Sequence, residues 1–242
     1  MFRILKQKEA ATYYEKYYPK LMKLWESAQY YDPRSELLIK LGTGRWKNKK
    51  ILDVGCGTGK VLKDAKIIEN NRVYGIDISR PFLEKARRKG IITMRFDINK
   101  KDRFPYPEKS FDCIVLLDVL EHIYYPRRLI KNCSAALKRG GTLILTLSKR
   151  IGGEFSVNKA KSMEMQLKKV YAGNVPDEAR RFVDFNFMTT KELKRILSAE
   201  GLRIVRMHGY NWKWNTLSSA EKQKLWKNPM RSKNVLYVIK KS

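Results

Sequence analysis

Three acidic residues and a run of glycines in this sequence are spaced as the residues of a binding site would be. Asp53 ends an apolar run, and alternate positions after it hold glycine: Gly55, Gly57 and Gly59. A strand that leads through a glycine-rich turn into a helix can hold a small ligand against backbone groups. Asp77 and Asp97 end the next two apolar runs. We therefore expect a ligand site at the carboxyl ends of successive strands.

The glycine spacing argues against two common ligands. A phosphate-binding P-loop needs a glycine where Val54 stands and a hydroxyl side chain where Val61 follows Lys60. A dinucleotide-binding turn needs its third glycine at position 60. The remaining pattern, acid-x-Gly-x-Gly-x-Gly, resembles the first motif of class I S-adenosylmethionine-dependent methyltransferases. A glycine turn in an unrelated α/β domain is the alternative.

The later carboxylates favour an adenosine-containing ligand. Asp77 follows Gly57 by 20 residues, where a carboxylate can accept hydrogen bonds from both ribose hydroxyls. A nicotinamide-binding domain has no standard need for a third acid at position 97, whereas the amino group of adenine can donate to one. Three successive strands that end in acids make chance a poor explanation.

Alternating strand and helix patterns predict the scaffold for these residues. Apolar strand patterns cover 51–54, 73–77, 91–96, 111–118, 142–147, 202–210 and 235–239. Helix patterns lie between them, at 61–68, 79–90, 129–137 (ended by Gly140 and Gly141), 189–201 and 218–228. This order predicts an α/β fold: a doubly wound, mostly parallel seven-stranded sheet with an antiparallel edge.

Two segments fall outside that alternation. Residues 10–41 form an aromatic helical pattern that 30–33 interrupts, with a second short helix at 35–41, and residues 148–187 form a poorly periodic insertion after the fifth strand. We expect N-terminal cap helices over 1–49, with Tyr30 or Tyr31 near the ligand in one interpretation, and a methyltransferase domain over 50–242 in which 148–187 is a lid. Surface packing is the alternative for both segments.

The resemblance to class I methyltransferases extends from residue 50 nearly to the end and is strongest over 51–147. The runs 111–123, 137–142 and 187–193 resemble the small-molecule branch, which includes quinone-biosynthesis O- and C-methyltransferases and proteins associated with methionine biosynthesis. The resemblance implies an enzyme that uses S-adenosylmethionine. It assigns cofactor contacts to Asp53, Gly55, Cys56, Gly57, Asp77 with Ile78 (ribose), Asp97 with Ile98 (adenine), and Leu117 with Asp118 (near the methyl group).

Methyl transfer from a sulfonium is an in-line displacement that needs alignment and exclusion of water more than chemical groups. A hydroxyl or amine acceptor also needs a base. The chain has two histidines, and His122, just past a strand end, is the predicted catalytic base, with a structural role as the alternative. Asp118, Glu121 and His122 match an acid-x-x-Glu-His pattern that some quinone-pathway relatives carry; three residues do not suffice to predict a metal, and none is predicted.

The charge balance keeps several acceptors open. The sequence holds 52 lysines and arginines against 24 aspartates and glutamates, a formal net charge of +28, which attracts nucleic acid, anionic membranes or acidic substrates, or is a solvated surface. A small, anionic or lipid-like acceptor is our first expectation. RNA is the main alternative, because Trp212, Trp214 and Trp226 lie among lysines. Peripheral docking of 212–233 on a membrane and a non-catalytic cofactor-binding subunit are further alternatives.

Two observations weigh against methylation of nucleic-acid bases. The strand at 111–118 continues as Leu-Asp-Val-Leu over 117–120, without the Asn/Asp-Pro-Pro-aromatic motif of many base-amine methyltransferases. Cys113 falls in a strand and Cys133 on an apolar helix stripe, away from the place of a pyrimidine-attacking nucleophile.

The cysteines and the apolar runs bear on where the protein is found. Cys56, Cys113 and Cys133 have no paired spacing, and no apolar run approaches the roughly 20 residues of a membrane span. We expect a cytoplasmic protein, and the sequence indicates no oligomeric state.

Overall fold

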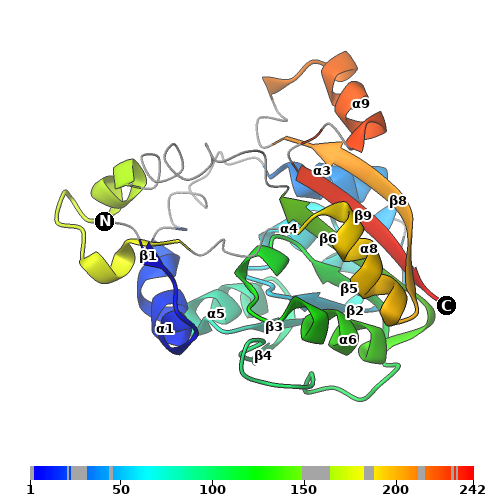
Figure 1. Ribbon diagram of the computed structural model, residues 1–242, viewed down its shortest axis with the longest axis horizontal. Coiled ribbons are helices and arrows are strands. Elements are labelled where there is room, and N and C mark those ends of the chain that lie inside the picture. Colours follow the sequence, from blue (N-terminus) through cyan, green and yellow to red (C-terminus); the bar gives the residue numbers. More distant parts are fainter. Residues whose placement is uncertain are drawn as a thin grey trace.

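A twisted sheet with helices on both faces forms the body of the computed structural model (Figure 1). The structure describes residues 3–20, 22, 32–43, 46–148, 164–182, 188–211, 216–229, 232 and 234–242. Within these residues, seven strands pair in the order β4-β3-β2-β5-β6-β9-β8. Their bounds are β2 Lys50–Val54, β3 Arg72–Asp77, β4 Ile92–Arg95, β5 Phe111–Leu116, β6 Leu137–Ser148, β8 Leu202–Tyr210 and β9 Asn234–Lys241.

The pairing confirms the predicted mostly parallel sheet with an antiparallel edge. Strands β4, β3, β2, β5 and β6 are mutually parallel. Strand β9 runs antiparallel to both of its neighbours, β6 and β8. The last strand of the chain is therefore inserted between β6 and β8. The carboxyl ends of β2, β3, β4 and β5 meet at one edge of the sheet, as the site prediction requires.

Two hydrophobic cores, one on each face, fix the helices to the sheet. Helices α6 (Pro126–Ala136) and α8 (Thr190–Ala199) pack on one face through Leu129, Ile130, Leu193 and Leu197. Helices α3 (Pro33–Lys40), α4 (Lys60–Asp64) and α5 (Arg80–Arg88) cover the other through Leu37, Leu62 and Leu83. Helix α9 (Ser219–Lys227) lies beside β8. The described residues also include short 3-10 turns at Ile68–Asn70 (η3), Leu120–His122 (η4) and Asp177–Ala179 (η5).

Local sequence signals predicted the later helices correctly, whereas two predicted helix ends were wrong. The capping boxes of Thr189 with Glu192 and of Ser218 with Glu221 are both formed. The helix expected to end at Gly140 and Gly141 instead ends at Ala136, because Leu137 pairs with Phe111 and already belongs to β6. The helix predicted over 61–68 is also shorter, since α4 ends at Asp64.

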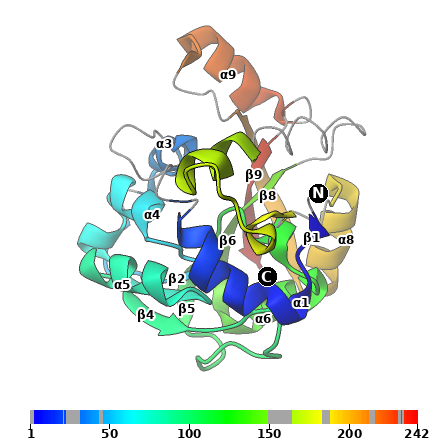
Figure 2. The same ribbon diagram turned by 90° about the vertical axis from the view of Figure 1, so that its left-hand side faces the viewer.

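The described parts of the N-terminal segment and of the insertion pack on each other. Helix α1 (Gln7–Thr12) continues as the π-helical turn η1 (Tyr13–Tyr17). Strand β1 (Arg3–Ile4) pairs in parallel with β7 (Arg181–Phe182). Tyr17 packs against apolar side chains of both segments, among them Leu5 and Leu167. Figure 2 shows α1 and residues 164–182 together in front of the sheet. Trp25, Tyr30, Tyr31 and 149–163 lie outside the described residues, and the domain boundaries stay a prediction.

Candidate active site

The turn between β2 and α4 is built on glycines in left-handed backbone conformations. Gly55 has a φ of +69°, and a Cβ there would lie 2.7 Å from Cγ2 of Val119. Only glycine meets both conditions without strain. The N–H groups of Gly55 and Cys56 both donate to the carbonyl of Ile76, at 2.8 and 3.1 Å. Any backbone contact that these two residues make to a ligand must therefore use their carbonyl groups.

Asp77 joins this turn to the end of β3. Its Oδ2 accepts a hydrogen bond from the N–H of Gly57, and its Oδ1 accepts one from the N–H of Ser79, each at 2.9 Å. Burial raises the pKa of Asp77, while these backbone donors and that of Ile78 oppose the rise. Each oxygen keeps a further lone pair. The carboxylate is thus fixed in place and can still accept the two hydroxyls of a ribose.

Asp53 and Cys56 lie deeper, under the turn. Asp53 is 4% exposed, and burial, reinforced by the charge of Asp77, raises its pKa to about 7, while Arg34 opposes the rise. The thiol of Cys56 is buried and its pKa is raised, first by burial. It packs so closely on Gly75 of β3 that a Cβ there would lie 2.7 Å from its sulfur. The Cys56 side chain is therefore a packing element between β2 and β3.

Asp97 and Asn99 organise the loop after β4. Oδ1 of Asp97 accepts from the N–H of Asn99 at 3.0 Å, and Ile98 packs against the core. The buried Asn99 side chain donates to the carbonyl of His122 at 3.3 Å and accepts from the N–H of Tyr124 at 2.9 Å. Asn99 thereby ties the loop after β4 to the loop after β5. Sequence reasoning missed it, because no periodicity marks a contact across 23 residues.

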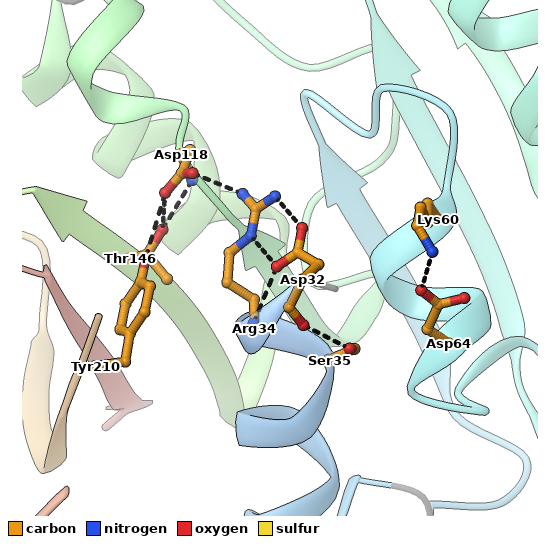
Figure 3. A network of polar contacts seen from close by, with 8 residues as sticks. All are labelled: Asp32, Arg34, Ser35, Lys60, Asp64, Asp118, Thr146 and Tyr210. Atoms are coloured by element: carbon orange, nitrogen blue, oxygen red, sulfur yellow. Dashed lines mark hydrogen bonds and ion pairs between the residues drawn. The ribbon is translucent and has the colours of Figure 1, made fainter. Parts of the chain in front are cut away.

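Asp118 follows Leu117, which is buried at the end of β5, and is the centre of a polar network that Figure 3 shows in detail. Its φ is +53°, a conformation that non-glycine residues rarely adopt. Oδ2 accepts from Nη1 of Arg34 at 2.8 Å, and Oδ1 accepts from Oγ1 of Thr146 at 2.9 Å. The Tyr210 hydroxyl donates to Oδ1 at 3.5 Å. Thr146 also accepts from the N–H of Asp118 at 2.8 Å, so the strained backbone is held from β6.

Arg34 brings helix α3 to the end of β5. Its Nε donates to Oδ1 of Asp32 at 2.8 Å, so its guanidinium bridges Asp32 and Asp118. Asp32 in turn caps α3 through the N–H of Arg34. Sequence reasoning missed Arg34, Thr146 and Tyr210; the Asp-Pro-Arg start of a helix predicts a cap and says nothing about an ion pair across 84 residues. Lys60, which follows the glycine turn, is bonded to Asp64 within α4 (Figure 3).

His122 and Glu121 lie on the turn η4 beside this network. The His122 ring meets the Tyr14 ring edge-on, with centroids 6.4 Å apart. Glu121 is 3% exposed; its Oε1 accepts from the N–H of Ser148 at 3.1 Å, and its Oε2 is buried without a hydrogen bond. Burial, and next the charge of Asp118, raise the pKa of Glu121. In the described ranges, no three His, Cys, Asp or Glu side chains are arranged to hold a metal ion.

Tyr14 of η1 and Tyr18, which follows η1, approach the same edge from the N-terminal segment. The Tyr14 hydroxyl is buried, and its pKa is raised by burial and then by neighbouring charges that include Asp77. Tyr18 meets Phe82 of α5 edge-on at 6.0 Å. These contacts place aromatic side chains next to Asp77 and His122, where cap helices were predicted.

Of the three tryptophans near the end of the sequence, the structure describes Trp226. The Trp226 ring stacks on His208 at 3.7 Å, and Nζ of Lys40 lies 5.8 Å from its centroid. His208 therefore occupies one face of this ring. Trp212 and Trp214 lie outside the described residues. Among the helices that the structure describes, none is long and apolar enough to cross a membrane.

A comparison with protein families identifies the chain. The model of a methyltransferase domain matches residues 24–207. The chain belongs to the methyltransferase-domain family. Its sheet order and its acid-ended strands are those of the class I branch, whose cofactor is S-adenosylmethionine.

Relatives of known name match the methyltransferase over shorter stretches. A ubiquinone biosynthesis O-methyltransferase of Coxiella burnetii is 32% identical over 107 residues, which are 43% of this chain and 45% of that protein. A protein of Methanocaldococcus jannaschii without an assigned role, MJ1123, is 27% identical over 158 residues, 64% of this chain and 65% of that one. The matches thus span about half to two thirds of the length of these relatives.

Solved structures share the fold at low sequence identity. The magnesium protoporphyrin IX methyltransferase of Synechocystis PCC 6803, with bound S-adenosylhomocysteine, has a TM-score of 0.64 at 16% identity, covering 98% of this chain and 100% of that one. The [4+2]-cyclase SpnF has the same TM-score and identity, covering 99% and 98%. One of these two proteins is named for a cyclisation reaction. The likeness therefore shows that the fold is shared, and the reaction has to be argued from the residues of the site.

Proposed function

We propose that this methyltransferase binds S-adenosylmethionine across the carboxyl ends of β2 to β5 and transfers its methyl group to an O, N or C atom of a small acceptor. The observation that carries the proposal is Asp77, held by the N–H groups of Gly57 and Ser79 with lone pairs left for a ribose. In the same assignment, Asp97 with Ile98 contacts the adenine, and Leu117 with Asp118 borders the methyl group.

The reaction needs little from the protein beyond placement. A lone pair of the acceptor attacks the methyl carbon, the carbon–sulfur bond breaks, and its electron pair stays on sulfur to give S-adenosylhomocysteine. A hydroxyl or amine acceptor also loses a proton, for which His122 is our proposed base. Its place on η4, in the loop that follows β5 and beside Tyr14, supports that role. The cap over 1–49 and the lid over 148–187 exclude water in this proposal.

The local charge favours a small acceptor over RNA. The carboxyl edge carries five acids, of which Arg34 neutralises one: Asp53, Asp77, Asp97, Asp118 and Glu121. The ionised carboxylates of this edge attract a sulfonium and repel phosphates. Burial raises the pKa of Asp53 and of Glu121, so these two contribute less of that negative charge. The match to ubiquinone biosynthesis O-methyltransferases supports a lipid-like acceptor. A location in the cytoplasm is part of the proposal.

RNA methylation is the second candidate, and the net charge of +28 is the observation that favours it. A non-catalytic cofactor-binding subunit is a third reading, against which the complete set of Asp53, Asp77 and Asp97 argues. Radiolabelled methyl transfer to total RNA and to a lipid and small-molecule extract, each at low and high salt, separates the candidates. We expect label in the extract; label in RNA that is lost steeply with salt would overturn the small-molecule proposal.

A further inference from the structure

Strand β4 carries two apolar side chains that the rest of the described chain covers only in part. It is the terminal strand of the order, so one of its backbone edges has no strand partner among the described residues. The connection from β4 to β5, residues 96–110, is fully described and contains no helix. The two side chains are those of Ile92 and Met94, which are 46% and 42% exposed. Parallel strands normally have both faces covered, so these two exposed side chains and the open backbone edge offer a surface that another chain could cover.

An open basic groove adjoins the same edge. It has a volume of about 660 Å³ and runs across the amino ends of β2, β3 and β4. Four cations line it against the single acid Glu69: Lys47, Lys49, Lys50 and Arg72. Ile92 also lines the groove, so the apolar edge and the basic groove are continuous.

Two of these cations lie against aromatic rings that are not part of the groove lining. Nζ of Lys50 lies 5.1 Å from the ring centroids of both Tyr74 and Phe111, and the Arg72 guanidinium lies 5.5 Å from that of Tyr74. A ring attracts a cation without neutralising its charge. Lys50 and Arg72 therefore keep their positive charge beside the groove.

From these observations we propose that β4 and the adjoining groove form a docking surface for an extended acidic segment of a partner protein. The segment adds a strand to β4, places apolar side chains on Ile92 and Met94, and directs carboxylates into the groove. The groove lies at the amino ends of the strands and the added strand runs along the outer edge of β4, so an occupied surface does not cover the carboxyl ends of β2 and β3.

Charge and chemistry favour this occupant over two others. A second copy of the chain would bring its own +28 and the same four cations to the contact. RNA could place phosphates in the groove, but it has no peptide backbone to pair with an open strand and no apolar side chains to pack on Ile92 and Met94. A polypeptide with alternating apolar and acidic residues satisfies the edge, the exposed side chains and the groove together.

The test uses the full chain and three labelled probes: a short peptide of alternating valine and glutamate, a peptide of alternating valine and lysine, and a single-stranded RNA. Fluorescence anisotropy measures binding, and hydrogen exchange reports on the amides of 92–95. We expect the valine–glutamate peptide to bind and to slow exchange in β4. Met94→Lys should weaken binding by at least about tenfold. Val205→Lys, at a 37% exposed position on the opposite edge strand β8, is the matched control and should leave binding unchanged.

Two results would overturn the proposal: no slowing of exchange in β4 with the acidic peptide, or equal losses in Met94→Lys and Val205→Lys. Binding of RNA alone, abolished by Lys50→Glu, would assign the surface to nucleic acid instead. Circular dichroism confirms that each variant is folded. Calorimetric titration with S-adenosylmethionine should be unaffected by Met94→Lys, so this test is independent of the proposed reaction.

Discussion

The two ends of strands β2, β3 and β4 lie at opposite edges of the sheet and differ in charge. The carboxyl ends carry Asp53, Asp77 and, just past β4, Asp97, whereas the amino ends border a groove lined by Lys49, Lys50 and other cations. The chain as a whole is strongly basic, and yet the edge that holds the proposed cofactor site is acidic. The net charge of the chain therefore determines which ligands are attracted at long range, whereas the charges at the site determine which ligand it binds.

The largest effect is expected at Asp77, on the acidic edge. Replacing it with alanine in Asp77→Ala leaves the N–H groups of Gly57 and Ser79 without their acceptor and removes the acceptor for a ribose. Hydrogen bonds to charged groups contribute about 1.5–3 kcal/mol each, so loss of two costs cofactor affinity about a hundredfold or more. Isothermal titration measures this. Asp64→Asn, whose exposed carboxylate pairs with Lys60 on α4, is the control and should bind normally.

The next effect is on stability, at the bridge between α3 and β5. In Arg34→Met, the carboxylates of Asp32 and Asp118 lose their shared cation, and the free energy of unfolding should fall by about 2–4 kcal/mol. Urea denaturation checks this. The double variant Arg34→Met with Asp118→Asn removes one stranded charge and should recover part of the loss. Additive losses would show that the two side chains do not stabilise each other.

A third prediction concerns the pH dependence of stability. Burial raises the pKa of Asp53 to about 7, against about 3.9 in an unfolded chain. Between these values the folded chain keeps a proton that the unfolded chain releases, so this contribution is present at low pH and is lost as pH rises to about 7. Asp53→Asn should therefore be more stable relative to wild type at about pH 8 than at about pH 5. Equal differences in urea unfolding at the two pH values would contradict the assignment.

The smallest effect is expected from the basic edge. Lys50→Glu reverses a charge that lies against Tyr74 and Phe111. Lys50 is at the amino end of β2, whereas Asp77 is at the carboxyl end of the neighbouring strand β3. Cofactor affinity should change by less than about twofold, because salt screens charges that lie at opposite edges of the sheet. A large change in calorimetric titration would mean that the two edges act as one electrostatic unit.

The parts of the fold that could be predicted from sequence are those fixed by local rules. Alternating strand and helix patterns, the glycine turn and two capping boxes gave the sheet and the positions of its acids. The contact of Arg34 with Asp118 spans 84 residues and that of Tyr210 with Asp118 spans 92, and each depends on how α3 and β8 pack. Neither leaves a periodic signal. The misplaced helix end before Gly140 shows the same limit, since pairing with β5 overrode a local stop signal.

Calorimetric titration of the wild-type chain with S-adenosylmethionine tests the central claim most directly. We predict saturable binding with a Kd between about 1 µM and 1 mM, the range usual for enzyme substrates, and its loss in Asp77→Ala but not in Asp64→Asn. Absence of binding heat in the wild type, or equal affinity in both variants, would contradict the assignment of the acidic edge to this cofactor.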